Sequence, residues 1–422
     1  MDNSWIPESS EEWFKWLKNE ESKTRNSYFA KPVNLIHDYG SERATKIDYE
    51  GREVLELLQN AADQAKDNNE SGRVVIELTD SGMVIANTGN AFSVGGIQSL
   101  QNAHLSPKRL GERKFIGCKG LGFRSILNWT SSPIIFSGSL ALAYSRKVTE
   151  EKLNALISDN EELAELVAKE TKKSDLPVLP VLPFPGYSID NDIHEFIDER
   201  NYELADKCLD WKRKGYTTAI AIPFNNSDIY DRALQQLSSL RPETLLFVDS
   251  LDELLFILPN EQERVWSKDG DDTAKMVLDN GSPIGIWQVF KTGGDVPEEY
   301  LNSDQNDKYS YELIVAVPEV EKASEIKSSP LFSYFPTEII IPLPIVCSAT
   351  LELTQDRNNI TKHESNRFVL ECLAEFIAEV AEQRARQHST GVKAGFRNVM
   401  PIGEFPLSLI NHGFPDVLLD TV

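Results

Sequence analysis

The sequence has few cysteines and a shortage of basic residues. Its 422 residues include four cysteines, none of which form a CxxC pair: Cys118, Cys208, Cys347 and Cys372. This spacing indicates neither a zinc site nor a disulfide framework, so we expect reduced thiols. Lys and Arg number 43 against 66 Asp and Glu, which gives a formal net charge of -23. Such a charge disfavours non-specific binding to nucleic acid or to an anionic membrane.

Long apolar segments are also missing. No run of about twenty apolar residues occurs, and the N-terminal residues lack the cationic start and apolar core of a signal peptide. These two absences predict a cytoplasmic protein without a membrane-spanning segment. The hydrophobic fraction of 41% is still sufficient for real cores, and the length predicts two or three domains.

A helical pattern is prominent at residues 53–66, EVLELLQNAADQAK. Its spacing places Glu56, Asn60 and Asp63 on one narrow polar stripe, which Asp67 continues. The rest of the helix surface is mainly apolar, so we expect a largely buried helix. Buried carboxylates and carboxamides need partners. The stripe therefore faces either a structural hydrogen-bond network or a ligand, and an ExxxN pair taken alone favours the structural alternative.

Two strand-associated motifs follow this helix. Residues 74–78 and 83–87 alternate as the strands of a β-hairpin, and the second strand ends in Asn87-Thr88-Gly89. An acceptor followed by glycine at a strand end can lie against the edge of a planar ligand, because Gly89 would allow close backbone approach, although a plain turn is the simpler explanation. Later in the chain, Thr218 begins a strand with the sequence TAIAIP, where threonine is an ordinary strand residue.

The segment at residues 88–122 is rich in glycine and is expected to be mainly a mobile loop. It leads into the motif GCKGLGFRS at 117–125, directly before a helix. Backbone N–H groups at a helix N-terminus can contact a phosphate, and Lys119 or Arg124 could add positive charge. The motif is not a Walker A loop, because the sequence contains no GxxxxGK[ST].

The four motifs are more specific in combination than singly. Their order and spacing, over about residues 50–225, resemble the GHKL ATPase superfamily, which includes the ninety-kilodalton heat-shock chaperones, DNA gyrase B, MutL and the sensor histidine kinases. The resemblance implies the Bergerat fold, an α/β sandwich that holds ATP between helices and a lid over a mixed sheet. Within the superfamily the chain looks most like sacsin-like proteins, on the segments YEGR at 49–52, NTGNAF, FIGCKGLGFRSI, LFSYFPTE and LTQDRNNI.

The resemblance implies a role for each matching residue. Glu56 would be the general base, Asn60 the Mg2+ ligand and Asp63 a support of the nucleotide pocket. Asn87 stands where most members have the aspartate that accepts a hydrogen bond from the adenine amino group, and its own NH2 donor leaves base choice open. The remaining nucleotide contacts would come from Gly89, Gly117, Lys119, Gly120, Leu121, Gly122, Phe123 and Thr218.

The predicted fold class is α+β with two main domains. An N-terminal arm at 1–45 precedes a Bergerat α/β sandwich at 46–258, which carries an insertion at about 149–210. A second α/β domain at 259–390 corresponds to the transducer-like middle domain of the chaperones, and 391–422 forms a C-terminal tail.

The resemblance also implies a cation from the second domain at the γ-phosphate. Arg357 is the candidate and Lys362 the alternative, and a solvated loop charge explains either residue equally well.

The chain is therefore expected to be an ATPase that uses ATP and Mg2+ and couples hydrolysis to conformational change in chaperone-like or mechanical work. A protein client or partner subunit is expected, with a homodimer as one arrangement. The alternative function is a nucleotide-gated sensor or interaction module with little hydrolysis, for example in a bacterial defence system. Nucleic acid is not favoured as a partner because of the net charge, although a basic patch at 108–114 could bind nucleotide or polynucleotide.

Overall fold

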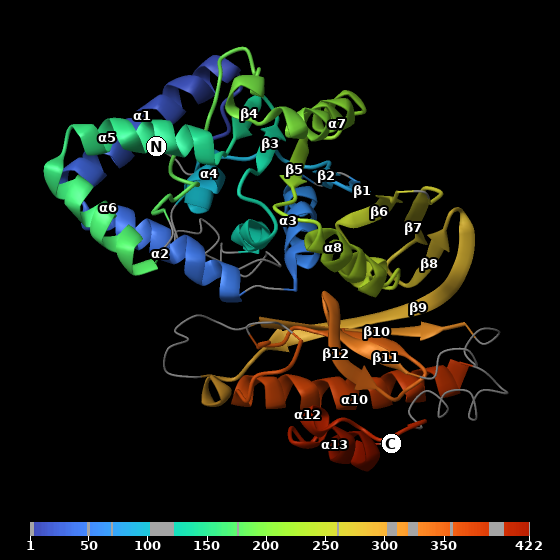
Figure 1. Ribbon diagram of the computed structural model, residues 1–422. Coiled ribbons are helices and arrows are strands. Elements are labelled where there is room, and N and C mark those ends of the chain that lie inside the picture. Colours follow the sequence, from blue (N-terminus) through green and yellow to red (C-terminus); the bar gives the residue numbers. More distant parts are fainter. Residues whose placement is uncertain are drawn as a thin grey trace. The chain divides into compact units, whose positions relative to one another are not determined.

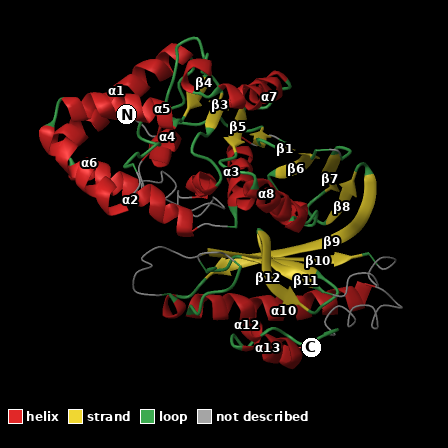
Figure 2. Cartoon of the chain, viewed as in Figure 1, coloured by secondary structure: helices red, strands yellow, loops and turns green. Residues whose placement is uncertain are grey.

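The computed structural model describes most of the chain, at residues 4–48, 51–68, 71–101, 122–174, 177–259, 261–301, 310–319, 328–354, 358–387 and 401–421. The chain divides into two compact units: the first comprises residues 1–238 and 254–263, and the second residues 239–253 and 264–422. Each unit combines helices with β-strands (Figures 1 and 2), so the expected α+β class is confirmed. No helix in the described ranges is long and apolar enough to cross a membrane.

The N-terminal part of the first unit is helical. Helices α1 (Ser10–Ala30) and α2 (Val33–Asp48) pack with α5 (Arg146–Ser158) and α6 (Glu161–Ser174), as Figure 1 shows. The apolar side chains that these helices share with the proline-rich segment after α6 form one core cluster: Tyr28, Leu35, Leu153, Leu156, Leu163, Val178 and Phe184. The expected N-terminal arm thus consists of two helices that pack against part of the expected insertion.

The sheet of the first unit has the strand order β6-β1-β2-β5-β3-β4. Its strands are β1 (Gly72–Thr79), β2 (Gly82–Asn87), β3 (Ile134–Ser137), β4 (Leu140–Ala143), β5 (Thr218–Pro223) and β6 (Leu251–Ile257). The pairs β1–β2, β2–β5, β3–β5 and β3–β4 are antiparallel. The predicted hairpin after the opening helix and the predicted strand at Thr218 are therefore confirmed.

The two faces of this sheet are covered by different helices. Helix α7 (Tyr202–Arg213) packs its Leu204 against a core cluster that includes Ala86 of β2 and Ala219 of β5. Successive strand residues point to opposite faces, so Asn87 and Thr218 point away from α7. Helix α3 (Glu53–Asn68) lies on that other side and contacts β1 and the 3₁₀ helix η2 (Figure 1).

The remaining helical elements of the first unit are short. They are α4 (Val94–Gln101), η2 (Gly122–Asn128), η3 (His194–Phe196), η4 (Glu199–Asn201) and α8 (Asp228–Ser239). The helix expected after the glycine motif is thus a 3₁₀ helix. Most of helix α7 lies inside the segment at about 149–210 that we expected to be an insertion, yet its buried side chains are part of the main core.

The second unit has the strand order β12-β11-β13-β10-β9-β8-β7. Its strands are β7 (Arg264–Gly270), β8 (Ala274–Asp279), β9 (Ser282–Asp295), β10 (Ser310–Pro318), β11 (Ser329–Ser333), β12 (Phe335–Ile341) and β13 (Val346–Ala349). The β11–β13 pair is parallel, whereas β7–β8, β8–β9, β9–β10, β10–β13 and β11–β12 are antiparallel. The antiparallel texture expected for this half of the chain is confirmed, with one parallel pair as an addition.

The core of the second unit lies between this sheet and the long helix α10 (Glu364–Gln387). The other helices of the unit are α9 (Thr244–Phe247), η5 (Glu298–Tyr300), α12 (Leu407–Ile410) and α13 (Phe414–Thr421). Leu409, Phe414 and Leu418 are each 0% exposed and belong to the α10 cluster. The segment that we expected to be a tail therefore contains two helices that pack into the core, because their apolar residues recur at helical spacing.

Candidate functional site

Helix α3 carries the polar stripe that the sequence predicts. Most apolar residues around the rest of its surface are buried, namely Val54, Leu57, Leu58, Ala61, Ala62 and Ala65, and Leu55 is half-buried. On the stripe, Glu56 is 3% exposed and Asp63 is 0% exposed, whereas Asn60 is half-buried. The carboxamide of Asn60 makes no hydrogen bond with another described residue, so its oxygen remains available to a ligand. The prediction of a largely buried helix is confirmed.

Glu56 forms a buried ion pair with Arg52. Arg52 Nη1 donates to Glu56 Oε1 at 3.0 Å, and the two side chains are only 5% and 3% exposed. Arg52 precedes the first residue of α3, where a positive charge meets the unfavourable end of the helix dipole. The Glu56 carboxylate offsets this charge and is itself held in one orientation. Sequence reasoning missed the pair, although the i, i+4 spacing of Arg52 and Glu56 was visible.

Glu53 is the centre of a second buried network. Its carboxylate is 0% exposed and accepts hydrogen bonds from Gly51 N at 3.1 Å, Asn128 Nδ2 at 3.1 Å and Gln236 Nε2 at 2.6 Å. Gln236 Oε1 in turn accepts from Val54 N at 3.0 Å. Burial raises the pKa of Glu53, and these hydrogen bonds oppose that rise only in part. The network anchors the N-terminus of α3 to η2 and α8.

The turn after β2 presses against the backbone of α3. Gly89 has φ +104, and a Cβ atom at this position would lie 2.7 Å from the carbonyl carbon and oxygen of Gln64. Asn90 N also donates to Gln64 O at 3.3 Å. The other side of the turn is tied to β1, because Arg73 N donates to Thr88 Oγ1 at 2.9 Å. The sequence predicted that Gly89 would allow a close approach to a ligand, whereas the structure shows its close approach to the helix that carries the polar stripe.

Three polar side chains form a row across the ends of β2, β5 and β3. Asn87 lies opposite Thr218, and Thr218 lies opposite Ser137. Their exposed fractions are 7%, 3% and 0% in that order. The Ser137 and Thr218 hydroxyl oxygens are 2.6 Å apart, Phe92 N donates to Ser137 Oγ at 2.9 Å, and Asn87 Nδ2 donates to Thr88 O at 2.8 Å. Ser137 had no signal in the sequence, because only strand pairing places it beside Thr218.

The expected phosphate-binding residues are only partly described. Gly117, Lys119, Gly120 and Leu121, as well as Arg357, lie outside the described residues. Gly122 and Phe123 begin η2. Lys362 is an exposed residue of the second unit.

Arg124, which the sequence suggested as a phosphate contact, has a structural role instead. It is 2% exposed and donates from Nε and Nη2 to Leu100 O at 3.1 and 3.0 Å and from Nη2 to Gln101 O at 2.9 Å. These are the last two carbonyls of α4, which lack partners within the helix and favour a cation. Burial lowers the pKa of Arg124, although nearby Glu42 opposes this effect. The expectation that its charge would serve a phosphate was therefore wrong.

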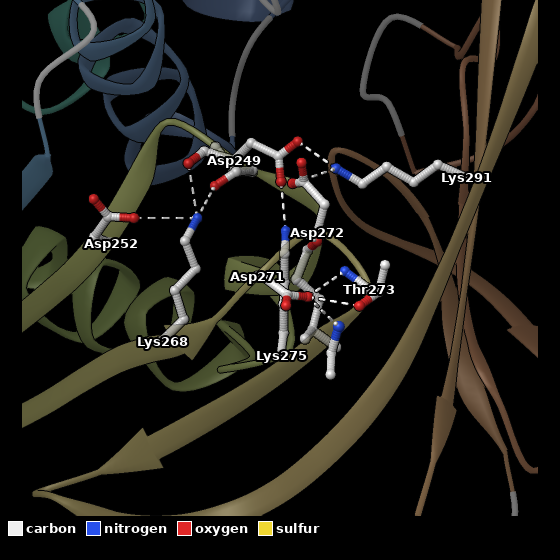
Figure 3. Close-up of polar contacts among 11 residues, drawn as sticks. Asp249, Asp252, Lys268, Asp271, Asp272, Thr273, Lys275 and Lys291 are labelled. Carbon is white, nitrogen blue, oxygen red and sulfur yellow. Dashed lines mark hydrogen bonds and ion pairs between the residues drawn. The ribbon is translucent and has the colours of Figure 1, made fainter.

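A separate polar cluster lies within the second unit (Figure 3). Lys275 and Lys291 pair with the two carboxylate oxygens of Asp249, at 2.5 and 2.6 Å. Lys268 donates to the carbonyls of Val248 and Asp249 at 3.0 and 2.8 Å. The strand register places the three lysines on the same face of β7, β8 and β9.

The charges in this cluster balance one another. The three lysines face Asp249, Asp252 at 3.4 Å from Lys268, and Asp272 at 3.9 Å from Lys291. Burial, together with the smaller effect of the Lys275 charge, lowers the pKa of Lys268 to about 8. Burial acts to raise the pKa of Asp249, but its bonds to Lys275 and Lys291 leave it lowered overall. A neutral, internally paired cluster does not attract a charged ligand, so we interpret it as a clamp that holds residues 239–253 on the sheet.

Comparison with known proteins gives weak and partial similarity. No protein-family model matches the chain. The chain is similar to Protein NO VEIN of Arabidopsis thaliana, with 24% identity over 207 residues, and this match covers 48% of the chain but 6% of that protein. The crystal structure of the N-terminal domain of a DNA repair protein has 10% identity and a TM-score of 0.32, covering 72% of this chain and 79% of that chain. A TM-score of this size supports no conclusion about fold or function.

Proposed function

We propose that the first unit is an ATP-binding, Mg2+-dependent ATPase domain of the GHKL type, with a Bergerat arrangement, and that the second unit acts as its transducer. In this proposal the protein is cytoplasmic and works on a protein client or partner subunit. The sequence motifs suggest this function. The geometry around α3 supports a ligand site better than it supports a purely structural network.

The observation that carries the proposal is the junction between α3 and the turn after β2. Gly89 and Asn90 contact the α3 backbone at Gln64, and the same turn begins at Asn87, which lies opposite Thr218. Three motifs from distant parts of the sequence thus meet on one side of one sheet. A plain turn does not require a glycine pressed against a helix. Here Gly89 presses against α3, whose polar stripe contains the Glu56 carboxylate and the Asn60 carboxamide, which makes no hydrogen bond with another described residue.

Asn60 is suited to hold a metal ion. It is half-buried, and its carboxamide oxygen has no hydrogen-bond donor among the described residues. An amide oxygen is a hard ligand of the kind that Mg2+ accepts. Bound Mg2+ would neutralise and orient the β- and γ-phosphates of ATP.

Glu56 is suited to accept the proton of an attacking water. Its carboxylate is 3% exposed, and Arg52 fixes the orientation of one oxygen at 3.0 Å. A positioned carboxylate in a site with little water is a competent general base. Asp63 is 0% exposed on the same stripe and would support the nucleotide pocket.

The test is Mg2+-dependent ATP hydrolysis and ATP binding by the full chain. Glu56→Ala should reduce turnover at least about 100-fold while ATP still binds, because a general base typically contributes 10²–10⁴-fold. Asn60→Ala should remove the dependence of binding on Mg2+. Glu150→Ala changes an exposed carboxylate on α5 and should leave both properties unchanged. Undiminished hydrolysis by Glu56→Ala would exclude Glu56 as the base.

The buried Arg52–Glu56 pair also favours a second candidate, a nucleotide-gated interaction module with little hydrolysis. Arg52 occupies Glu56 Oε1, so in this candidate turnover would wait for a partner that moves Arg52 away from that oxygen. The two functions differ in single-turnover measurements. A gated module binds ATP but releases phosphate only after a partner is added, whereas an autonomous ATPase turns over alone.

A further inference from the structure

The hydrogen-bond pattern at Ser137 determines which hydroxyl donates. Ser137 Oγ is fully buried and already accepts from Phe92 N, and it lies 2.6 Å from Thr218 Oγ1. Each hydroxyl carries one hydrogen. If Thr218 donated to Ser137, the Ser137 hydrogen would be buried without an acceptor among the described residues. Whichever hydroxyl accepts keeps one unbonded hydrogen, and this is less costly on Thr218, which retains some exposure, so Ser137 donates and Thr218 accepts.

This direction leaves the hydrogen of Thr218 available to a ligand. Thr218 retains 3% exposure, whereas Ser137 has none, so only Thr218 can present a hydroxyl beyond the pair. Thr218 therefore acts as a donor toward whatever occupies this side of the sheet.

The side-chain amide of Asn87 is oriented so that it complements the Thr218 donor. Its Nδ2 donates to Thr88 O at 2.8 Å, and a flipped amide would bring two oxygens together there. The amide oxygen consequently points away from Thr88 O and is an acceptor. Since Asn87 lies directly opposite Thr218, an acceptor and a donor stand side by side on neighbouring strands. One of the two N–H donors of the Asn87 amide, the group that left base choice open, is thus already in use.

We propose that Ser137 is a positioning residue: by donating to Thr218, it makes Thr218 a donor toward the ligand. The site would then select a purine that has an amino donor beside a ring-nitrogen acceptor. This inference rests on the proposed nucleotide-binding function. Adenine has that edge, with its amino group beside N1. Hypoxanthine and guanine present the reverse, a carbonyl oxygen beside an N–H, and would meet acceptor with acceptor and donor with donor.

The sharpest probe pair is ATP and inosine triphosphate, because the two differ only in the polarity of that edge. Binding to the full chain is measured by calorimetry in the presence of Mg2+. Ser137→Ala should weaken ATP binding about 3- to 10-fold and leave inosine triphosphate binding within about twofold, because one neutral hydrogen bond is involved. Ser137→Thr keeps the hydroxyl and should retain the preference for ATP.

A double-mutant cycle tests the coupling. Thr218→Val should weaken ATP binding by a similar factor. Ser137→Ala combined with Thr218→Val should bind ATP no more weakly than Thr218→Val alone, since Ser137 acts on the ligand only through Thr218. Ser99→Ala is the matched control: it removes another buried hydroxyl, whose bond to Gly95 O at 2.8 Å stays within α4, and it should not alter binding.

The outcomes separate the two levels of the proposal. If the wild-type chain binds neither nucleotide, the proposed function fails and this inference fails with it. If the wild type prefers ATP but Ser137→Ala keeps the same ratio of affinities, the role of Ser137 is refuted while nucleotide binding stands. If Ser137→Ala does not fold, Thr218→Val decides, because an unchanged ATP preference in that variant refutes the polarity argument.

Discussion

Replacement of Gly89 by alanine tests the junction on which the site depends. The new Cβ atom would lie 2.7 Å from two backbone atoms of Gln64 and 2.8 Å from Ala65 N, and backbone cannot move aside as a side-chain tip can. The position also has φ +104, a left-handed conformation that costs about 1–2 kcal/mol for a residue with a Cβ. Forced overpacking adds about 1–3 kcal/mol. Gly89→Ala should therefore lower the stability of the structure around α3 by about 2–5 kcal/mol.

Gly215 provides a matched control in the same unit. It has φ +94, but a Cβ atom there would meet nothing within 4 Å. Gly215→Ala should thus show only the conformational cost of about 1–2 kcal/mol. The difference between the two variants isolates the contact between the turn and α3.

The assay is native-state hydrogen exchange of peptides from residues 53–68, which reports the local opening of α3. A chain of two units need not unfold in one step, so a local measurement is more informative than one global midpoint. Gly89→Ala should increase exchange in these peptides by the equivalent of about 1–3 kcal/mol more than Gly215→Ala does. Equal effects of the two variants would refute the close contact.

Three further changes test other parts of the structure. Gln236→Ala removes the two bonds that link Glu53 and Val54 to α8 and should destabilise the first unit by about 1–3 kcal/mol in urea unfolding; a change below about 0.5 kcal/mol would show that the network is unimportant. Phe414→Ala should cost the second unit about 3–5 kcal/mol by thermal unfolding, because the ring is 0% exposed, whereas Leu419→Ala, at 62% exposure, should have little effect. The pKa of Lys268, about 8, lies below the ordinary lysine value of 10.5, so between these pH values the unfolded chain binds the extra proton and stability rises with pH by at most about 3 kcal/mol. Lys268→Met should lack that rise when unfolding midpoints are compared from pH 7 to pH 10, and parallel pH profiles of wild type and variant would contradict the assignment.

Several local features of this protein followed from the sequence. The period of residues 53–66 predicted both the helix α3 and its buried apolar surface, because a helix with one polar line has few ways to pack. Alternation predicted β1, β2 and β5, and the position of Asn87 and Thr218 at strand ends was visible from the same pattern. Such signals are local, so a few residues suffice to read them.

The structure contradicts two other predictions that were made from local sequence. Arg124 adjoins the glycine motif, and proximity in sequence suggested a phosphate contact, whereas its guanidinium binds the carbonyls that end α4. The segment near the C-terminus was read as a tail because it is rich in Gly and Pro, yet Phe414 and Leu418 are buried on α10. In both cases the deciding partner lies on another element and leaves no mark in the local pattern.

The sequence by itself determined which residue types are available to the proposed nucleotide site and on which elements they stand. Only the tertiary structure decided their partners: Arg52 for Glu56, Gln236 for Glu53 from 183 residues away, and Ser137 for Thr218 from 81 residues away. The physical reason is that a buried polar group takes its partner from whichever element packs against it, and packing joins elements without regard to sequence separation. The polarity of the Asn87–Thr218 edge is therefore a property of the folded sheet, because neither residue has that polarity alone.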